Sequence, residues 1–179
     1  MRGPKRAALL YSASEIEVLD LPELAVHDYV GKLGPDPLDD EVTGDVIADR
    51  LRDRAWSGRQ LAGLLLDQGF VAGLGNYLRA DILHTAAIHP KRRARDLDDG
   101  EIERLADEIV RLPRQSYATK GITNFLDRVE QLKARGVRRS HYRHHIYDRD
   151  GRDCYRCGEM VERQTIGGRA MFFCPGCQL

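Results

Sequence analysis

The chain has 179 residues, and its 28 basic and 28 acidic residues give a formal net charge of zero. Hydrophobic residues make up 42% and charged residues 31%, which excludes a chain disordered by composition and fits one domain or two small ones. No apolar run reaches the length of a membrane span and residues 1–18 do not form a signal peptide, so we expect a soluble cytoplasmic protein with no membrane partner.

The predicted elements of the first third are short. Residues 7–11 have the composition of a strand but no sheet partner nearby, and residues 31–43 form a loop rich in Gly, Pro and Asp. Apolar residues at helical spacing predict a helix over 43–54. We expect Ser57 to cap a further helix within 58–69.

The middle of the chain is predicted to be helical. Residues 64–83, "LLLDQGFVAGLGNYLRADIL", contain a glycine-rich break, after which a helix restarts and ends near residue 89. Asp98 or Asp99 is expected to cap another helix, with Pro113 beyond its end. Residues 121–136 predict one more helix, and the chain then becomes basic and irregular.

Charge is distributed unevenly along the chain. Residues 1–58 carry 7 basic and 12 acidic residues, whereas residues 131–170 carry 10 basic and 5 acidic ones. A basic C-terminal part indicates contact with a polyanion. A solvated surface with scattered charge explains the same counts equally well.

All four cysteines lie near the C-terminus, in two Cys-x-x-Cys pairs separated by 16 residues. Two such tight turns can complete a tetrahedron of thiolates, so the spacing predicts one structural Zn²⁺. Two disulfides or a redox pair are weaker interpretations, because there is no export signal and no βαβ setting. A closed tetrahedral site does not catalyse. The expected zinc ligands are Cys154, Cys157, Cys174 and Cys177.

The segment between the two cysteine pairs predicts a β-hairpin. Gly167 and Gly168 lie between strand-like residues and mark its tip, and Arg169 follows directly. A tail this short needs a metal in order to fold. Taken alone, Arg169 is better explained as a surface arginine or as part of a structural ion pair than as a functional residue.

The glycine-rich break has the composition of an anion-binding corner. Gly73 and Gly75 permit positive φ and a close approach of a ligand, and the first amides of the next helix favour an anion. Asn76 can cap that helix or offer its amide to a phosphate. From this stretch alone, an ordinary corner between two helices is the simpler interpretation. Its Gly-x-Gly is weak as a nucleotide-binding signature, because no strand clearly precedes it and the third glycine of that signature is missing.

Together, "LLLDQGFVAGLGNYLRADIL", "YDRDGRDC" and "CYRCGEMVERQTIGGRAMFFCPGCQ" resemble the formamidopyrimidine-DNA glycosylase and endonuclease VIII family of base-excision repair enzymes. "LLYSASEIEVL" and "RLPRQSYATKG" are similar to the endonuclease VIII branch. The resemblance implies a mainly α fold, a helix–two-turn–helix bundle with a C-terminal β-hairpin zinc finger and a short remnant of an N-terminal β-sandwich. The expected boundaries are 1–20 for the remnant, 21–145 for the helical DNA-binding domain and 146–179 for the finger.

The resemblance also implies a DNA-binding site. Gly73, Gly75 and Asn76 match the two-turn element that grips phosphates, and Lys32 matches a basic DNA-binding position. Arg169 matches the finger-tip arginine, which contacts phosphate and assists strand cleavage, so it is the one residue with an implied catalytic role. The implied partner is double-stranded DNA with a damaged base or an abasic site, bound by a monomer, with a separate N-terminal fragment as a further partner.

The chemistry of the family depends on an N-terminal proline followed by glutamate. Here Met1 is followed by Arg2 and Gly3, and Pro4 is internal. We therefore expect the C-terminal part of an endonuclease VIII-like DNA glycosylase and abasic-site lyase acting on oxidised pyrimidines, inactive in base excision on its own. The alternatives are a non-catalytic protein that shields abasic sites and a zinc-ribbon module that binds other proteins.

The remaining polar residues are predicted to lie on the surface. We expect His141, His144 and His145 to face solvent or phosphate rather than a metal, because the zinc site already has four thiolates. By analogy with the family, Tyr117 and Lys120 are expected to face the DNA groove.

Overall fold

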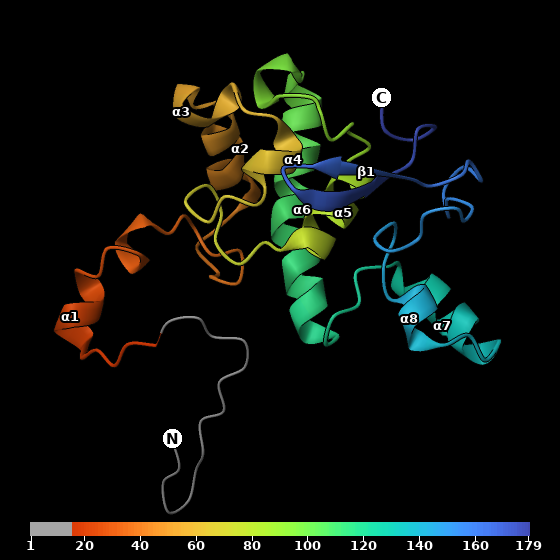
Figure 1. Ribbon diagram of the computed structural model, residues 1–179, viewed down its shortest axis with the longest axis horizontal. Helices are drawn as coiled ribbons and strands as arrows, with labels where there is room; N and C mark the ends of the chain where they lie inside the picture. Colours follow the sequence, from red (N-terminus) through yellow and green to blue (C-terminus); the bar gives the residue numbers. More distant parts are fainter. Residues whose placement is uncertain (1–15) are drawn as a thin grey trace, which may run out of the picture. The chain divides into compact units, whose positions relative to one another are not determined.

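A computed structural model describes residues 16–179, which form two compact units (Figure 1). The first unit ends at Lys32 and the second comprises residues 33–179, and each is described by itself. The strand predicted at 7–11 lies outside the described residues.

The first unit contains one short helix, α1 (Leu21–Ala25), and a 3-10 turn, η1 (Val30–Lys32). Asp20 caps α1 reciprocally with Glu23: the Asp20 side chain accepts from the Glu23 amide at 2.9 Å, and the Glu23 side chain accepts from the Asp20 amide at 2.9 Å. Lys32 is exposed and ends the turn η1.

The second unit is mostly helical and closes with a two-stranded antiparallel hairpin, as predicted. Its elements are α2 (Gly44–Arg52), α3 (Arg54–Ser57), α4 (Leu61–Leu64), α5 (Asn76–Thr85), η2 (Ala94–Asp96), α6 (Asp99–Ala118), α7 (Leu126–Ala134), α8 (Arg139–Tyr142), β1 (Glu162–Ile166) and β2 (Arg169–Phe173). The hairpin pairs Glu162 with Phe173 and Ile166 with Arg169. Among residues 16–179, no helix combines the length and the apolar character needed to cross a membrane.

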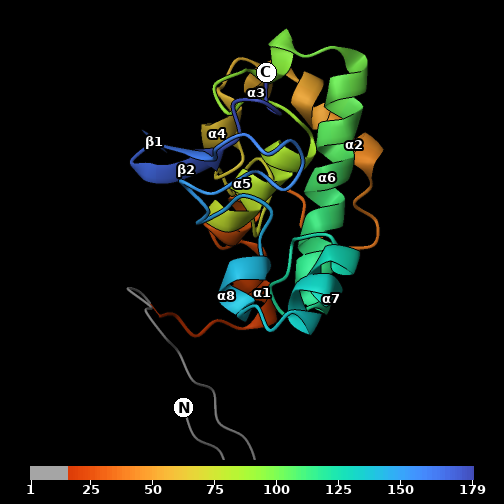
Figure 2. The same cartoon turned by 90° about the vertical axis from the view of Figure 1, so that its right-hand side faces the viewer.

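One hydrophobic core joins α2, α4, α5, α6 and the hairpin. The long helix α6 lies along α2 and α5, and the hairpin packs against α5 (Figure 2). Burial of these apolar faces is the main stabilising contribution to the fold. Helix α5 is buried on all sides, since every residue from Leu78 to His84 is buried. The core includes Ile47, Leu51, Leu61, Leu64, Ile82, Leu83, Leu105, Ile109, Met171 and Phe172.

Ser57 does not cap a helix, contrary to the prediction. It is the last residue of α3, which is capped by Asp53. The next helix, α4, follows Gln60, whose side chain makes no capping bond. Gln60 forms an antiparallel bridge with Arg93, and this long-range pairing keeps the backbone before α4 extended.

Asp98 caps α6 through a capping box, as predicted, but α6 does not end before Pro113. It continues through that buried proline to Ala118. A proline inside a helix removes one amide donor and crowds the preceding turn. Here tertiary contacts outweigh that cost, because Arg114 donates three hydrogen bonds of 2.8–3.0 Å to carbonyls of the 37–42 loop.

The helix predicted over 121–136 is shorter in the structure, where α7 begins at Leu126. The amides of Thr123 and Asn124 both donate to the Arg143 carbonyl, at 2.8 and 3.2 Å. These amides are engaged with a distant segment, so residues 121–125 form an irregular connection in place of the first helical turns.

Candidate nucleic-acid interface and metal centre

The four cysteine thiols converge in one cluster. Their Sγ atoms all lie within 4.8 Å of one another, with 3.8 Å between Cys154 and Cys177 and 3.4 Å between Cys157 and Cys174. Sulfurs placed about 2.3 Å from one zinc ion form a tetrahedron with edges of about 3.8 Å. All four thiols are free, so they are not disulfides. The cluster can therefore hold a metal ion.

The surroundings of the cluster suit thiolate ligands. The Arg156 amide lies 3.4 Å and His84 Nε2 lies 3.3 Å from Cys154 Sγ. Burial raises the pKa of the Cys174 thiol to about 11, and a coordinated divalent cation would reverse that shift by stabilising the thiolate. A Cβ at Gly176 would lie only 3.3 Å from Cys157 Sγ, so this turn fits closely around the sulfur.

The hairpin tip presents Arg169 to solvent. Gly167 and Gly168 have φ of 62° and 74°, and such left-handed values are required at both central residues of a type I′ turn. Arg169 begins β2 and is exposed. No carboxylate in residues 16–179 forms an ion pair with it. Its guanidinium therefore has no carboxylate partner in the described part of the chain.

The glycine corner (residues 73–76) is braced by a glutamine and leaves a helix N-terminus uncapped. Gln68 Oε1 accepts from the Gly73 amide at 2.9 Å, and its Nε2 donates to the Leu74 carbonyl at 3.1 Å. The N-cap of α5 is Gly75, which has no side chain to bond the first amides of the helix. Unpaired amides at a helix N-terminus and the positive end of the helix dipole favour an anion.

Asn76 connects the corner to the hairpin and does not cap α5. It is the first residue of the helix, and its Nδ2 donates to the Ala170 carbonyl at 2.9 Å. Ala170 directly follows Arg169, so one hydrogen bond between residues 94 positions apart brings the two motifs together. The structure thus brings together Gly73, Gly75, Asn76 and strand β2, which begins at Arg169. Lys32, the other predicted DNA-binding residue, belongs to the first unit.

Arg79 completes this junction, and nothing in the sequence motifs identifies it. It is fully buried and donates to the Ala62 carbonyl at 2.9 Å, the Asn76 Oδ1 at 2.5 Å and the Ala170 carbonyl at 3.2 Å. Burial, together with nearby Arg169, lowers the pKa of Arg79 to about 10, so it remains charged at neutral pH. The sequence signal is weak: Arg79 stands between the apolar residues Leu78 and Ala80.

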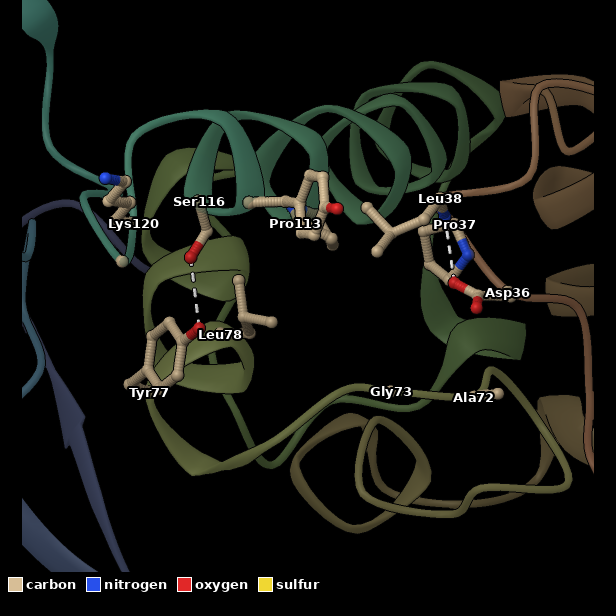
Figure 3. Close-up of a pocket in the computed structure, with 12 residues that line it drawn as sticks. Asp36, Pro37, Leu38, Ala72, Gly73, Tyr77, Leu78, Pro113, Ser116 and Lys120 are labelled. Carbon is tan, nitrogen blue, oxygen red and sulfur yellow. Dashed lines mark hydrogen bonds between the residues drawn. The ribbon is translucent and has the colours of Figure 1, made fainter. Parts of the chain in front are cut away.

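A pocket of about 340 Å³ lies between the corner and the last turns of α6 (Figure 3). Gly73, Tyr77 and Pro113 line it, and so do the exposed residues Tyr117 and Lys120, which were predicted to face the groove. The Tyr77 hydroxyl lies 3.0 Å from the hydroxyl of Ser116 on α6. The pocket therefore adjoins the same corner that the hairpin contacts.

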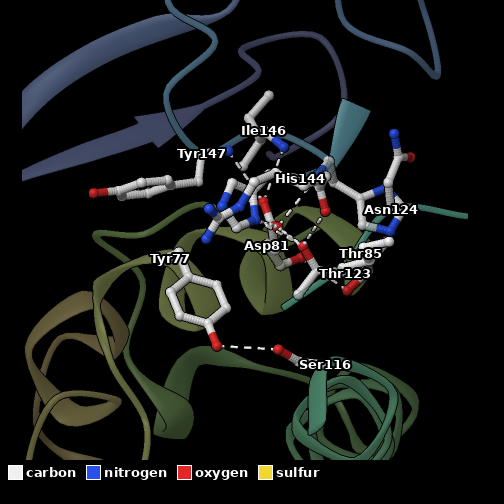
Figure 4. Close-up of polar contacts among 12 residues, drawn as sticks. Tyr77, Asp81, Thr85, Ser116, Thr123, Asn124, His144, Ile146 and Tyr147 are labelled. Carbon is white, nitrogen blue, oxygen red and sulfur yellow. Dashed lines mark hydrogen bonds and ion pairs between the residues drawn. The ribbon is translucent and has the colours of Figure 1, made fainter. Parts of the chain in front are cut away.

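A buried carboxylate on α5 holds the segment that precedes the four cysteines (Figure 4). Asp81 is fully buried and accepts hydrogen bonds from three consecutive backbone amides, those of residues 145, 146 and 147, at 2.9–3.2 Å. It also accepts from the Thr123 hydroxyl, and His144 Nδ1 lies 3.4 Å away. Asp81 thereby attaches two distant segments, around Thr123 and over residues 144–147, to α5.

This network overturns the prediction for two of the three histidines. His144 is 5% exposed and His145 is fully buried, whereas His141 is exposed. Burial lowers the pKa of His145 to about 4, so its ring is neutral at physiological pH. The basic run suggested a solvated surface, but the His144 ring and the His145 amide both contact the buried Asp81 carboxylate, so these two residues face inward.

The conformation of the corner makes a testable prediction about its two glycines. Gly73 has a φ of 79°, and Gly75 has an extended backbone at φ −112°; a Cβ at either would meet no atom within 4 Å. We expect Gly73→Ser to lower the free energy of unfolding by about 1–2 kcal/mol, because a side chain disfavours left-handed φ. Gly75→Ser is the matched control and should be neutral or stabilising, since serine is a preferred N-cap. Urea denaturation would measure both, and equal effects would contradict the strain argument.

The chain is similar to known proteins over most of its length. A family model described as the formamidopyrimidine-DNA glycosylase H2TH domain matches residues 33–126. "Endonuclease 8" of Escherichia coli K12 is 41% identical over 173 residues, which are 97% of this chain and 62% of the relative. The chain therefore spans less than two thirds of the length of that curated relative.

Solved structures have the same fold. A complex of Lactococcus lactis Fpg with DNA containing an abasic site matches with a TM-score of 0.71 and 24% identity, covering 89% of this chain and 56% of the other. A complex of Lactococcus lactis Fpg (MutM) with DNA containing FAPY-dG matches with a TM-score of 0.70 and 25% identity, covering 88% and 55%.

Proposed function

The chain belongs to the formamidopyrimidine-DNA glycosylase family through its H2TH domain, and from that premise we propose that it binds double-stranded DNA carrying a damaged base or an abasic site. It acts as the C-terminal part of an endonuclease VIII-like glycosylase and abasic-site lyase for oxidised pyrimidines. In this role it is a cytoplasmic monomer, with domains at 21–145 and 146–179.

The hydrogen bond from Asn76 to the Ala170 carbonyl is the observation that carries this proposal. It joins the uncapped N-terminus of α5 to the strand that begins with Arg169, and this proximity supports a phosphate-binding surface shared by the helix amides and the guanidinium. Backbone amides at a helix N-terminus and a free guanidinium both bind phosphate oxygens. Such contacts set the position of a protein on DNA without reading the sequence.

Zinc is the metal that the cysteine cluster is proposed to hold, as one structural ion. Four thiolates at tetrahedral spacing are the donor set of structural zinc sites. The ion would supply rigidity to a hairpin of two five-residue strands, which is too small to be stable alone. The hairpin then directs Arg169 at the DNA backbone.

Arg169→Ala tests the DNA interface. We expect it to weaken binding to a duplex with an abasic site by about 1.5–3 kcal/mol, the value of a hydrogen bond to a charged group. Arg163→Ala is the matched control, because Arg163 is an exposed arginine of the same hairpin; by strand alternation it faces the opposite side. Fluorescence anisotropy measures both affinities, and an unchanged affinity of Arg169→Ala would contradict the proposed interface.

The alternatives give different results in two further measurements. Six phosphate contacts would give a log–log slope of affinity against salt of about −5, whereas a slope near zero supports a protein-interaction module. Borohydride trapping on abasic-site DNA tests for lyase activity. We expect no covalent adduct with this chain alone, and a trapped adduct would overturn that expectation and indicate a lyase.

A further inference from the structure

Arg79 is a buried charge with no counter-ion in the described part of the chain. It is 0% exposed and is among the largest fully buried side chains. Its guanidinium donates only to neutral acceptors, two backbone carbonyls and the Asn76 side chain, and its Nε has no partner. Within residues 16–179, no carboxylate lies within ion-pair distance of it.

The position of Arg79 makes this charge still less favourable in the free protein. It lies at the fourth position of α5, next to the positive end of the helix dipole. Arg169 is close enough to act on it by charge repulsion. Buried charges are ordinarily paired, since an unpaired one costs several kcal/mol of desolvation. The Arg79 charge, the α5 dipole and Arg169 therefore all raise the positive potential at this junction, and no carboxylate of residues 16–179 pairs with Arg79 there.

We propose that Arg79 is a positioning residue whose charge is compensated by a backbone phosphate of DNA bound at the glycine corner. The inference rests on the proposed DNA-binding function and deepens it. Arg79 does not reach the surface, so it acts through the Asn76 side chain and the Ala170 carbonyl, which it orients. Its field favours an anion at the N-terminus of α5. Arg79 thus contributes to binding at the expense of the stability of the free protein.

The test compares variants of Arg79 on the full chain with its metal bound. Arg79→Met removes the charge and keeps the apolar length, whereas Arg79→Lys keeps the charge. The affinity for a duplex with a tetrahydrofuran abasic-site analogue and the Tm of the DNA-free protein are measured for both. We expect Arg79→Met to bind about tenfold more weakly with a Tm at or above that of the parent. Arg79→Lys should retain most of the affinity.

Two outcomes would overturn the inference. One is an affinity of Arg79→Met equal to that of the parent. The other is a lower Tm and a weaker affinity in both variants alike, which indicates a purely structural role. If Arg79→Met does not fold, Arg79→Gln gives the same comparison, because it retains donors without charge. Arg169→Ala is measured alongside: if it too leaves binding unchanged, the proposed function fails, and if it alone weakens binding, only the role of Arg79 fails.

Discussion

Replacing Cys174 by serine is expected to remove the proposed zinc ion from the chain and to abolish the proposed DNA binding. Cys174 is fully buried in the cluster, and its Sγ lies 3.4 Å from that of Cys157. A structural zinc contributes about 10–16 kcal/mol to the folding of a small finger, which exceeds what two short strands provide. Without it the hairpin no longer holds Arg169 beside the glycine corner. Metal analysis of the purified protein and DNA anisotropy measure the two losses.

Chelation and reconstitution provide the control for this substitution. The parent protein should lose its hairpin signals in NMR spectra when zinc is chelated and recover them, with its DNA affinity, when zinc is returned. Cys174→Ser should not recover. A serine variant that keeps one zinc per chain would contradict a four-thiolate site.

Asp81→Asn is expected to be the most destabilising single change outside the cysteine cluster. The buried carboxylate accepts three consecutive amides and the Thr123 hydroxyl, and His144 lies within ion-pair distance. Removing one member of such a buried network costs about 3–5 kcal/mol of unfolding free energy. Asp99→Asn is the control, because that side chain is 84% exposed and its pair with Arg52 is worth about 1 kcal/mol or less. Urea denaturation measures both.

The pKa of Asp81 determines how the difference in unfolding free energy between the parent and Asp81→Asn depends on pH. Burial raises that pKa, but the hydrogen bond with His144, the nearby His145 and the Thr123 hydroxyl together hold it well below its usual range. Such a group stabilises the fold fully above its unfolded pKa of about 3.9, and the contribution is lost as the pH falls through the lower folded value. The difference in unfolding free energy between the parent and Asp81→Asn should therefore be the same at pH 8 and pH 5.5. If this free-energy difference is smaller at pH 5.5 than at pH 8, the lowered pKa of Asp81 is contradicted.

Local patterns predicted the parts of the fold that depend on neighbouring residues. The spacing of the cysteines and the paired glycines at 167 and 168 require only short-range geometry, and the cluster and the hairpin are both present. Pro113 shows where such rules fail, because α6 continues through it against its local preference.

The parts that sequence reasoning missed depend on contacts between distant residues. Asp81 meets amides 64 to 66 positions away, and Arg79 meets a carbonyl 91 positions away. A buried arginine and a buried aspartate are exceptions to the usual exposure of charged residues. The spacing of residues within α5 does not indicate these partners, because they come from distant parts of the chain and meet α5 only in the folded protein.

The burial of α5 on every side has a consequence for how this protein can diversify. Its N-terminal turn joins the hairpin through Asn76, its middle holds Asp81, and near its C-terminal end His84 lies 3.3 Å from Cys154 Sγ. A ten-residue helix is a rigid rod of about 15 Å, so each of these neighbours fixes the rod for the others. Natural variants should accumulate on α7 and on the outer side of α6, while α5 changes only in concert with three other segments.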